Sequence, residues 1–363
     1  MAYGAPGFGL GGSCKPMFGA VSAVLPQRIA FVLVPQFSMI AFTSAVEPLR
    51  LANRASGKVL YDWHLFSTDG KPVPASNGIV LHPEGSIEQA QGYGTVVLCS
   101  GIDGHRFQDK NLFAWLRRAD RAGADLGALC TGSHVLAHAG LLDGHRCTIH
   151  WENLASFAEE FPEIEVTAEL FEIDRNRFTC AGGTAALDMM LNMIALQHGH
   201  ELATAVSDQF MHERIRDQHD QQRMALPIRL GVRHPKLISV IKLMEENLEE
   251  PLSRGELAAE AGLSSRQLER LFRKYLGRSP ARYYVELRLN RARLLLLQTN
   301  MSVIDVALAC GFVSASHFSK CYRDYFGKTP RHERSRPGMG QGAGAGGPAA
   351  EPSALQDLKL AGG

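Results

Sequence analysis

Short apolar runs alternate with amphipathic stretches over the first two hundred residues. Runs such as 28–34 and 95–100 have the length and the β-branched content of buried strands. Stretches such as 44–55 have the apolar spacing of a helix. Strands that alternate with helices form a parallel sheet covered on both faces, so we predict a doubly wound α/β domain over residues 27–200. Further predicted elements are strands at 61–67, 125–129 and 147–150, helices at 109–122, 153–161 and 184–198, and a strand pair within 165–180.

The remainder of the chain has a different character. Residues 201–234 are polar and predict a connecting helix and a linker. Residues 235–335 have helical periodicity throughout and predict a separate all-α domain. Residues 1–26 are rich in small residues and predict a flexible leader. The Gly-rich residues 336–363 bury too little apolar surface to offset the entropy of ordering, which predicts a disordered tail.

The all-α domain contains an internal repeat. Leu257-Ala-Ala-Glu-Ala-Gly-Leu263 is repeated as Val306-Ala-Leu-Ala-Cys-Gly-Phe312, 49 residues later. A small residue in the first helix of each unit lets a second helix cross closely, and the glycine can adopt positive φ in the turn. Each unit opens with a helix-capping pattern, Ser253-x-x-Glu256 and Ser302-x-x-Asp305. The repeat therefore predicts two helix-turn-helix units.

The second helix of each unit presents a polar face. In helices 264–276 and 314–326, apolar residues recur every four positions and leave the opposite face open. Arg and Gln can form bidentate bonds to base edges, whereas Ser and Lys more often contact phosphates. A long helix at 282–298 would hold the two units about 34 Å apart, the spacing of successive major-groove turns. The candidate DNA-binding residues are Ser265, Arg266, Gln267, Arg270 and Arg273 in the first unit, and Ser314, Ala315, Ser316, His317, Lys320 and Arg323 in the second.

The distribution of charge supports double-stranded DNA as the partner. The net charge of the chain is only +1, but residues 266–336 contain fifteen Lys or Arg against five Asp or Glu. A basic segment on an acidic body is typical of a polyanion-binding module joined to another domain. An ordinary helical bundle with basic faces is the alternative. Two aligned copies of the motif favour the DNA-binding interpretation over that alternative.

The repeated segment resembles a known family. Residues 267–280, 288–295 and 311–318 look like the AraC/XylS transcription regulators over roughly 100 residues. The resemblance implies a sequence-specific regulator, an activator of catabolic genes, that works with RNA polymerase. Glu333 stands three residues after Pro330, where the first copy has Tyr283, and this departure affects only the last helical turn.

The α/β segment carries one cysteine with a special context. The apolar run 125–129 leads into Cys130, and a glycine two residues later opens a helix, which is the geometry of a nucleophile elbow. Amides at a helix start would lower the pKa of the thiol and stabilise an anion nearby. Gly101 could supply another amide, and His150 follows a predicted strand at the same edge of the sheet.

Residues 28–200 resemble the class I glutamine amidotransferase-like domains of the PfpI type, which implies a flavodoxin-like fold for the doubly wound α/β domain. In enzymes of that superfamily the elbow cysteine is the nucleophile, with a nearby histidine and often a carboxylate after the first strand. Here Thr131 stands where several hydrolytic members have histidine, and the loop 35–42 contains no acidic residue. We therefore expect a protein that is not an enzyme. A bifunctional protein with cysteine hydrolase or glyoxalase-like activity is the alternative.

The order of the two domains resembles the GlxA type of AraC regulators. Residues 37–53 and 173–180 are similar to members that sense arginine, carnitine or glycine betaine. The resemblance implies that the old active-site cleft binds a small amino-acid-like or quaternary-ammonium effector and that the protein is a homodimer. The candidate effector-binding residues are Cys130, Thr131, His150, Glu47, Gly101, Phe37 and Trp151.

Each of these residues also has a structural explanation. The aromatic side chains of Phe37 and Trp151 could simply pack in the core, and Glu47 could be a charge on a helix surface. Cys130 could be an inert buried thiol.

The other cysteines and the hydropathy set further expectations. The seven cysteines are irregularly spaced and include no CxxC pair, so we expect reduced thiols in a cytoplasmic protein, with no metal and no cofactor. No apolar run approaches the roughly 20 residues that a membrane helix needs, so we expect no membrane partner.

Overall fold

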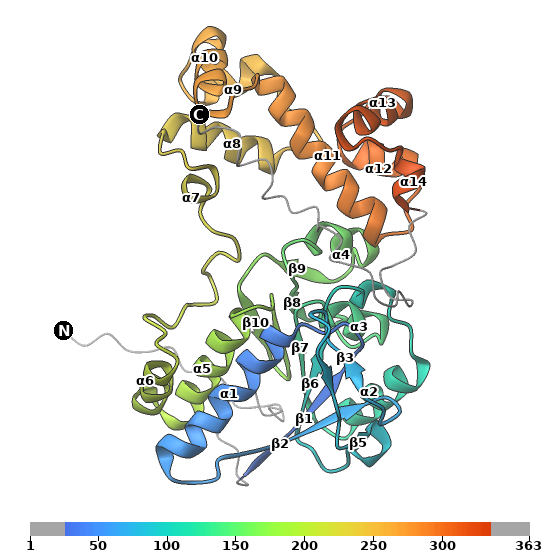
Figure 1. The fold of residues 1–363 in the computed structure, drawn as a ribbon, viewed down its shortest axis with the longest axis vertical. Helices are drawn as coiled ribbons and strands as arrows, with labels where there is room; N and C mark the ends of the chain where they lie inside the picture. The colour runs from blue at the N-terminus through green and yellow to red at the C-terminus, as the bar shows by residue number, and fades with distance from the viewer. Residues whose placement is uncertain (1–25, 335–363) are drawn as a thin grey trace, which may run out of the picture.

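A seven-stranded sheet forms the centre of the amino-terminal domain in the computed structural model, which describes residues 26–334 (Figure 1). All its strand pairs are parallel except the β10–β11 pair at one edge. In spatial order the strands are β10 (Phe171–Asp174), β11 (Arg177–Cys180), β7 (Asp125–Leu129), β6 (Thr95–Cys99), β1 (Gln27–Leu33), β2 (Tyr61–Ser67) and β5 (Gly85–Ser86). Two small sheets pair β3 (Val73–Pro74) with β4 (Val80–Leu81) and β8 (Arg146–Thr148) with β9 (Glu165–Thr167).

Helices cover both faces of the sheet, each over its own apolar core. Side chains of β1 alternate between the two cores, since Phe31 packs with one set of helices and Val32 with the other. One face carries α1 (Met39–Ser56), α5 (Ala185–His198) and α6 (His200–Gln209). The other carries α2 (Lys110–Arg121), α3 (Gly132–His138), α4 (Leu154–Glu160) and the short 3-10 turns η1 (Ile87–Gln89) and η2 (Gly104–Arg106). The predicted doubly wound fold is confirmed.

Two local predictions need correction. Helix α1 begins at Met39 rather than at residue 44, because Ser38 caps it by accepting a hydrogen bond from the amide of Ala41. The strand expected at 147–150 is β8, which ends at Thr148 and pairs with β9 in a small sheet of its own. The predicted leader and tail lie outside the described residues, except for residue 26.

The carboxyl-terminal domain consists of helices that form two units around a central helix. The central helix is α11 (Pro280–Gln298), and its first half packs in one core while its second half packs in the other. The first core is made with α8 (Pro235–Glu246), α9 (Arg254–Glu260) and α10 (Ser265–Leu276), and the second with α12 (Val303–Ala309), α13 (Ala315–Phe326) and α14 (Pro330–Arg334). Both predicted capping boxes, at Ser253 and Ser302, are present. The two predicted helix-turn-helix units are thereby confirmed.

The second unit is fixed to α11 at its turn. Gly311 has φ +70°, and a Cβ there would lie 2.7 Å from the carbonyl oxygen of Glu249, so only glycine fits. Arg288 of α11 donates to the carbonyls of Cys310 and Gly311, at 2.7 and 2.6 Å, and stacks on the ring of Phe312. A turn held by a charged side chain in this way keeps the second unit at a set angle to α11.

Glu333 has a larger structural role than the sequence comparison of the two copies suggested. Its side chain is 1% exposed and forms ion pairs with Arg293 of α11 at 3.3 Å and Lys328 at 2.8 Å. In the first copy, the ring of Tyr283 lies 5.6 Å from that of Phe272. The departure from Tyr283 therefore replaces an aromatic contact with a buried ionic one and does not merely weaken the last turn.

The two domains touch where the end of α11 meets α4 (Figure 1). Arg106 donates to the carbonyl of Leu297 at 3.1 Å, and Ser156 donates to the side chain of Gln298 at 2.7 Å. A long connection, including α7 (Leu226–Leu230), joins the domains on the other side. Among residues 26–334, no helix is long and apolar enough to span a membrane.

Candidate functional site

The polar faces predicted on the second helix of each unit are at the surface. Leu268 and Phe272 of α10, and Phe318 and Tyr322 of α13, are fully buried on the opposite face. In α10, Arg266, Gln267, Arg270 and Arg273 are exposed and Ser265 is half-buried. In α13, Ser314, Ser316, His317, Lys320 and Arg323 are exposed and Ala315 is half-buried. Each unit thus offers a cationic, hydrogen-bonding surface of the kind that enters a major groove, and α10 adds the side-chain amide of Gln267.

Some of these side chains already have intramolecular contacts. The Gln267 carbonyl accepts from the amide of Ser264 at 2.8 Å in a capping box, which leaves its amide NH₂ to donate. Arg273 pairs with Glu269 at 3.2 Å. Arg266 and Arg270 have no ion pair within the described part of the chain. Arg270 is therefore the guanidinium most available to a base edge from the centre of α10.

The cysteine elbow lies where strands β6 and β7 end. Cys130 follows β7 directly and has φ +61°, a strained conformation for a residue with a side chain. Its amide donates to the carbonyl of Cys180 at 3.0 Å. Gly182 makes the elbow possible, because a Cβ there would lie 2.7 Å from that of Cys130. Ligands of open α/β sheets bind at this carboxyl edge, so the elbow stands in the expected place.

Thr131 and Gly101 meet beside the elbow. The Thr131 hydroxyl donates to the carbonyl of Gly101 and lies 3.1 Å from the Ser100 hydroxyl. Phe37 pairs with Gly101 through a backbone bridge. The structure therefore brings together Cys130, Thr131, Gly101 and the backbone of Phe37 at the ends of neighbouring strands.

The prediction of a lowered pKa for the Cys130 thiol is wrong. Burial, with a smaller contribution from the neighbouring Cys180, raises the pKa of Cys130 to about 12. The hydrogen bond from the Thr131 amide lowers the pKa, but desolvation outweighs it. At neutral pH the group is a thiol and a poor nucleophile.

Alkylation of Cys130 by iodoacetamide is expected to be slow at neutral pH. Because the pKa of Cys130 is raised, only a very small fraction of the molecules carries the thiolate at pH 7. The rate should rise about tenfold per pH unit between pH 7 and 9, as followed by peptide-resolved mass spectrometry. Rapid labelling at pH 7 would instead reveal an activated thiolate.

The side chains of two further residues that were predicted to bind the effector, Phe37 and Glu47, have other contacts. Phe37 is 0% exposed and its ring stacks edge-on against Phe42 in the core, so a ligand cannot reach it without opening that core. Glu47 lies on α1, and its half-exposed carboxylate pairs with Arg50 of the same helix at 2.6 Å. For both residues the structure agrees with the structural explanation given above.

His150 and Trp151 adjoin the connection between the domains. The guanidinium of Arg223 lies 4.2 Å from the centre of the Trp151 ring, in a cation–π arrangement. The His150 ring is 5.6 Å from that of Trp151, and burial lowers the pKa of His150. A cation already occupies the aromatic face that was expected to receive an effector.

Arg223 belongs to an irregular segment, residues 211–225, which we call the strap. Asp188, fully buried at the start of α5, anchors its first part by accepting from His212 at 2.9 Å and from Arg216 at 2.6 Å. Farther along, Gln222 donates to the Thr148 hydroxyl at 3.1 Å and to the Glu169 carbonyl at 2.9 Å. The strap is thus bound along the domain that contains the elbow.

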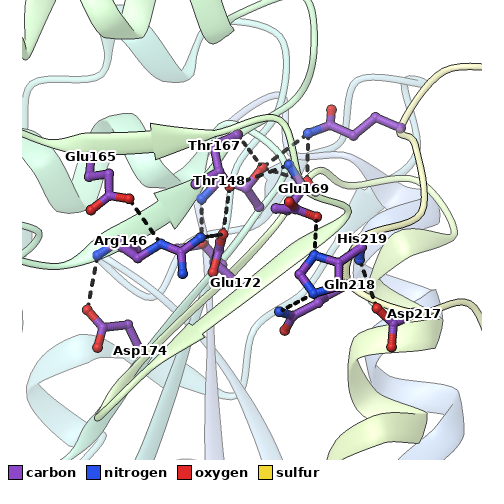
Figure 2. A network of polar contacts seen from close by, with 12 residues as sticks. Arg146, Thr148, Glu165, Thr167, Glu169, Glu172, Asp174, Asp217, Gln218 and His219 are labelled. Carbon is purple, nitrogen blue, oxygen red and sulfur yellow. Dashed lines mark hydrogen bonds and ion pairs between the residues drawn. The ribbon is translucent and has the colours of Figure 1, made fainter.

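The middle of the strap contacts the β9–β10 connection (Figure 2). Figure 2 shows His219 beside Glu169, and the two side chains lie 3.1 Å apart. On the other side of the same connection, Arg146 pairs with the buried Glu172 at 3.0 Å and with Glu165 at 3.2 Å. These pairs fix the surface on which the strap rests.

The strap residues were missed by the sequence interpretation. Its polar, irregular composition is typical of a linker, and nothing local distinguishes an anchored linker from a loose one. The dense alternation of Arg214, Arg216, Asp217, Asp220 and Arg223 was the available signal.

The exposed faces of α10 and α13, together with the α/β domain and its elbow, define a class of protein. It is a DNA-binding regulator with an appended α/β domain. The description "Helix-turn-helix domain" matches residues 257–336, and "DJ-1/PfpI family" matches residues 27–196. The HTH-type transcriptional regulator GbdR of Pseudomonas aeruginosa is 52% identical over 316 residues, covering 87% of this chain and 86% of that one. CdhR of the same species is 48% identical, covering 86% and 92%.

Two further proteins are less similar to this chain in sequence. GlxA of Rhizobium meliloti, an HTH-type transcriptional regulator, is 38% identical over 86% of this chain and 97% of its own. A solved AraC family regulator from Pseudomonas putida is 31% identical over 51% of this chain and all of its own, with a TM-score of 0.47. The chain belongs to the AraC-type helix-turn-helix transcriptional regulators that carry a DJ-1/PfpI domain.

Proposed function

We propose that the protein recognises an operator with two half-sites, one for α10 and one for α13. The observation that carries this proposal is the pair of exposed recognition faces attached to one rigid helix, α11. The measurement is the binding of promoter fragments to the whole protein at several salt concentrations. We expect affinity to fall steeply with salt, since phosphate contacts release counterions. An affinity that depends on neither the salt concentration nor the DNA sequence would refute the proposal.

A small effector is proposed to bind between the elbow and the strap, at Cys130, Thr131, Gly101, His150 and Trp151. The cation–π contact of Arg223 suggests the chemistry, because a quaternary-ammonium group could take the place of the guanidinium on Trp151. Displacing Arg223 would loosen the strap and shift the helix-turn-helix units relative to the α/β domain. An amino-acid-like effector is the second candidate.

A thermal-shift screen of betaines and amino acids on the whole protein tests this site. A ligand at one hundred times its Kd should stabilise the folded state by about 2.7 kcal/mol. The shift should be smaller in Trp151→Leu and unchanged in Glu47→Gln, because Glu47 is paired on α1. Equal shifts in both variants would remove Trp151 from the site.

Replacing Cys130 by alanine is expected to leave operator binding unchanged while altering the response to the effector. The side chain lies in the α/β domain, on none of the surfaces of α10 or α13. A promoter–reporter assay with and without effector measures the response, and the purified variant gives the affinity for DNA. An unaltered response would exclude Cys130 from the effector site.

The α/β domain is proposed to be a sensor without catalytic turnover. The raised pKa of Cys130 argues against a thiolate nucleophile at neutral pH. Incubating the whole protein with methylglyoxal and with amide substrates tests this, and turnover that Cys130→Ala abolishes would favour the bifunctional alternative. We further propose a cytoplasmic homodimer that activates catabolic genes through RNA polymerase, following the family resemblance.

A further inference from the structure

Three histidines and a glutamate gather at the side of the α/β domain that faces α11. His134 and His138 are four residues apart on α3, so both side chains lie on the same face of that helix. Glu160 ends α4 and approaches both of them, 3.8 Å from Nδ1 of His134 and 3.6 Å from Nε2 of His138. The ring of His105, in η2, is centred 6.1 Å from that of His134. Neither the DNA-binding surface nor the elbow uses these groups.

The environment of His134 is unusual for a structural histidine. Its side chain is 0% exposed, and neither ring nitrogen has a hydrogen-bond partner. The rings of Phe157 and Phe161 lie 5.1 and 6.1 Å from it. Buried polar groups in native proteins are normally satisfied, so an unpaired imidazole in an aromatic surrounding indicates a missing partner.

The donor atoms match one class of ligand. Two imidazoles and a carboxylate form a donor set used by protein zinc sites, with the fourth position taken by water or another side chain. The three donor atoms all lie within 4.8 Å of one another. In a tetrahedral site, zinc–nitrogen bonds of about 2.1 Å require donors about 3.4 Å apart, which side-chain rotations would provide. Magnesium and calcium prefer oxygen donors and fit this set poorly.

We propose that His134, His138 and Glu160 bind a divalent transition-metal ion of the zinc class. This differs from the sequence expectation of no metal, which considered only the cysteine spacing. The site joins α3 to α4, and α4 and η2 make the contacts with Leu297 and Gln298 at the end of α11. A bound ion would therefore stiffen the surface on which the DNA-binding domain rests.

The test uses the full-length protein, purified without a histidine tag and stripped with a chelator. After dialysis against micromolar Zn²⁺, elemental analysis should find one tightly bound ion per chain. His138→Gln and Glu160→Gln should each weaken binding at least tenfold, since each removes one donor. His82→Gln, at an exposed histidine outside the cluster, should bind as the wild type does.

Cobalt substitution identifies the donors independently of the variants. Co²⁺ in the wild type should give the visible spectrum of a tetrahedral site with nitrogen and oxygen ligands. A thiolate charge-transfer band would instead assign binding to a cysteine, such as Cys321 beside His317. That band, the absence of tight binding, or full binding by both the His138 and Glu160 variants would overturn the proposal.

Discussion

Replacing Arg270 by alanine is expected to weaken operator binding by about tenfold to a hundredfold, which corresponds to the 1–3 kcal/mol of one good bidentate base contact. Arg270 is exposed near the middle of α10, on the face opposite the buried Leu268 and Phe272. It has no ion pair within residues 26–334, so its guanidinium loses no intramolecular partner on binding. Fluorescence anisotropy of a labelled operator, at several salt concentrations, measures the loss.

The control for this variant is Arg121→Ala, which removes the same charge from an exposed position on α2 of the α/β domain. It should change the affinity for the operator little, because salt screens the effect of a charge that lies outside the helix-turn-helix units. Both variants should melt within a few degrees of the wild type, because exposed substitutions rarely change stability by more than about 0.5 kcal/mol. Equal affinities of the two variants would remove α10 from the DNA interface.

The helix-turn-helix units were predictable because their determinants are local. A capping serine, its partner three residues later and a glycine at the turn are all within a dozen residues, as in Ser253, Glu256 and Gly262. The alternation of strands and helices likewise needs no knowledge of distant contacts. Fold class and domain type could therefore be predicted from the sequence.

The environment of Cys130 could not be predicted in the same way. Its pKa depends on desolvation and on Cys180, which follows fifty residues later and reaches the elbow only through the pairing of β11 with β7. The helix start beside it is visible in the sequence, but the burial that outweighs it is not. The burial of the Phe37 side chain could not be predicted for a related reason, since an aromatic residue after a strand has the same sequence pattern in a core and in a pocket.

Glu333 and the strap show the same limit for charged residues. A glutamate three residues after Pro330 suggests an exposed helix end, yet it pairs with Arg293, forty residues earlier in the chain. The strap anchors at Asp188, which the sequence places within an apolar helix pattern. Buried ionic contacts between distant segments leave no periodic signal, because each partner alone has the pattern of a surface residue.

Asp188→Ala is expected to lower the free energy of unfolding by about 3 kcal/mol and to release the strap. The loss of one partner from a buried ion pair typically costs 3–5 kcal/mol, and here the cost is at the lower end because Arg216 is 26% exposed and can be hydrated. Chemical denaturation measures the stability. The released strap should be cut by trypsin at Arg214, Arg216 and Arg223, far faster than in the wild type.

Asp208→Ala is the matched control, since this aspartate is exposed on α6 and only its backbone carbonyl, which the substitution keeps, is bonded to the strap, at the amide of Met211. It should leave both stability and cleavage unchanged. If the strap transmits the effector signal, Asp188→Ala should also bind operator without responding to the effector, because the helix-turn-helix surfaces remain intact while their connection is loose. Cleavage of both variants at the wild-type rate would mean that the anchor at Asp188 does not hold the strap, and the proposed coupling would then lack its physical basis.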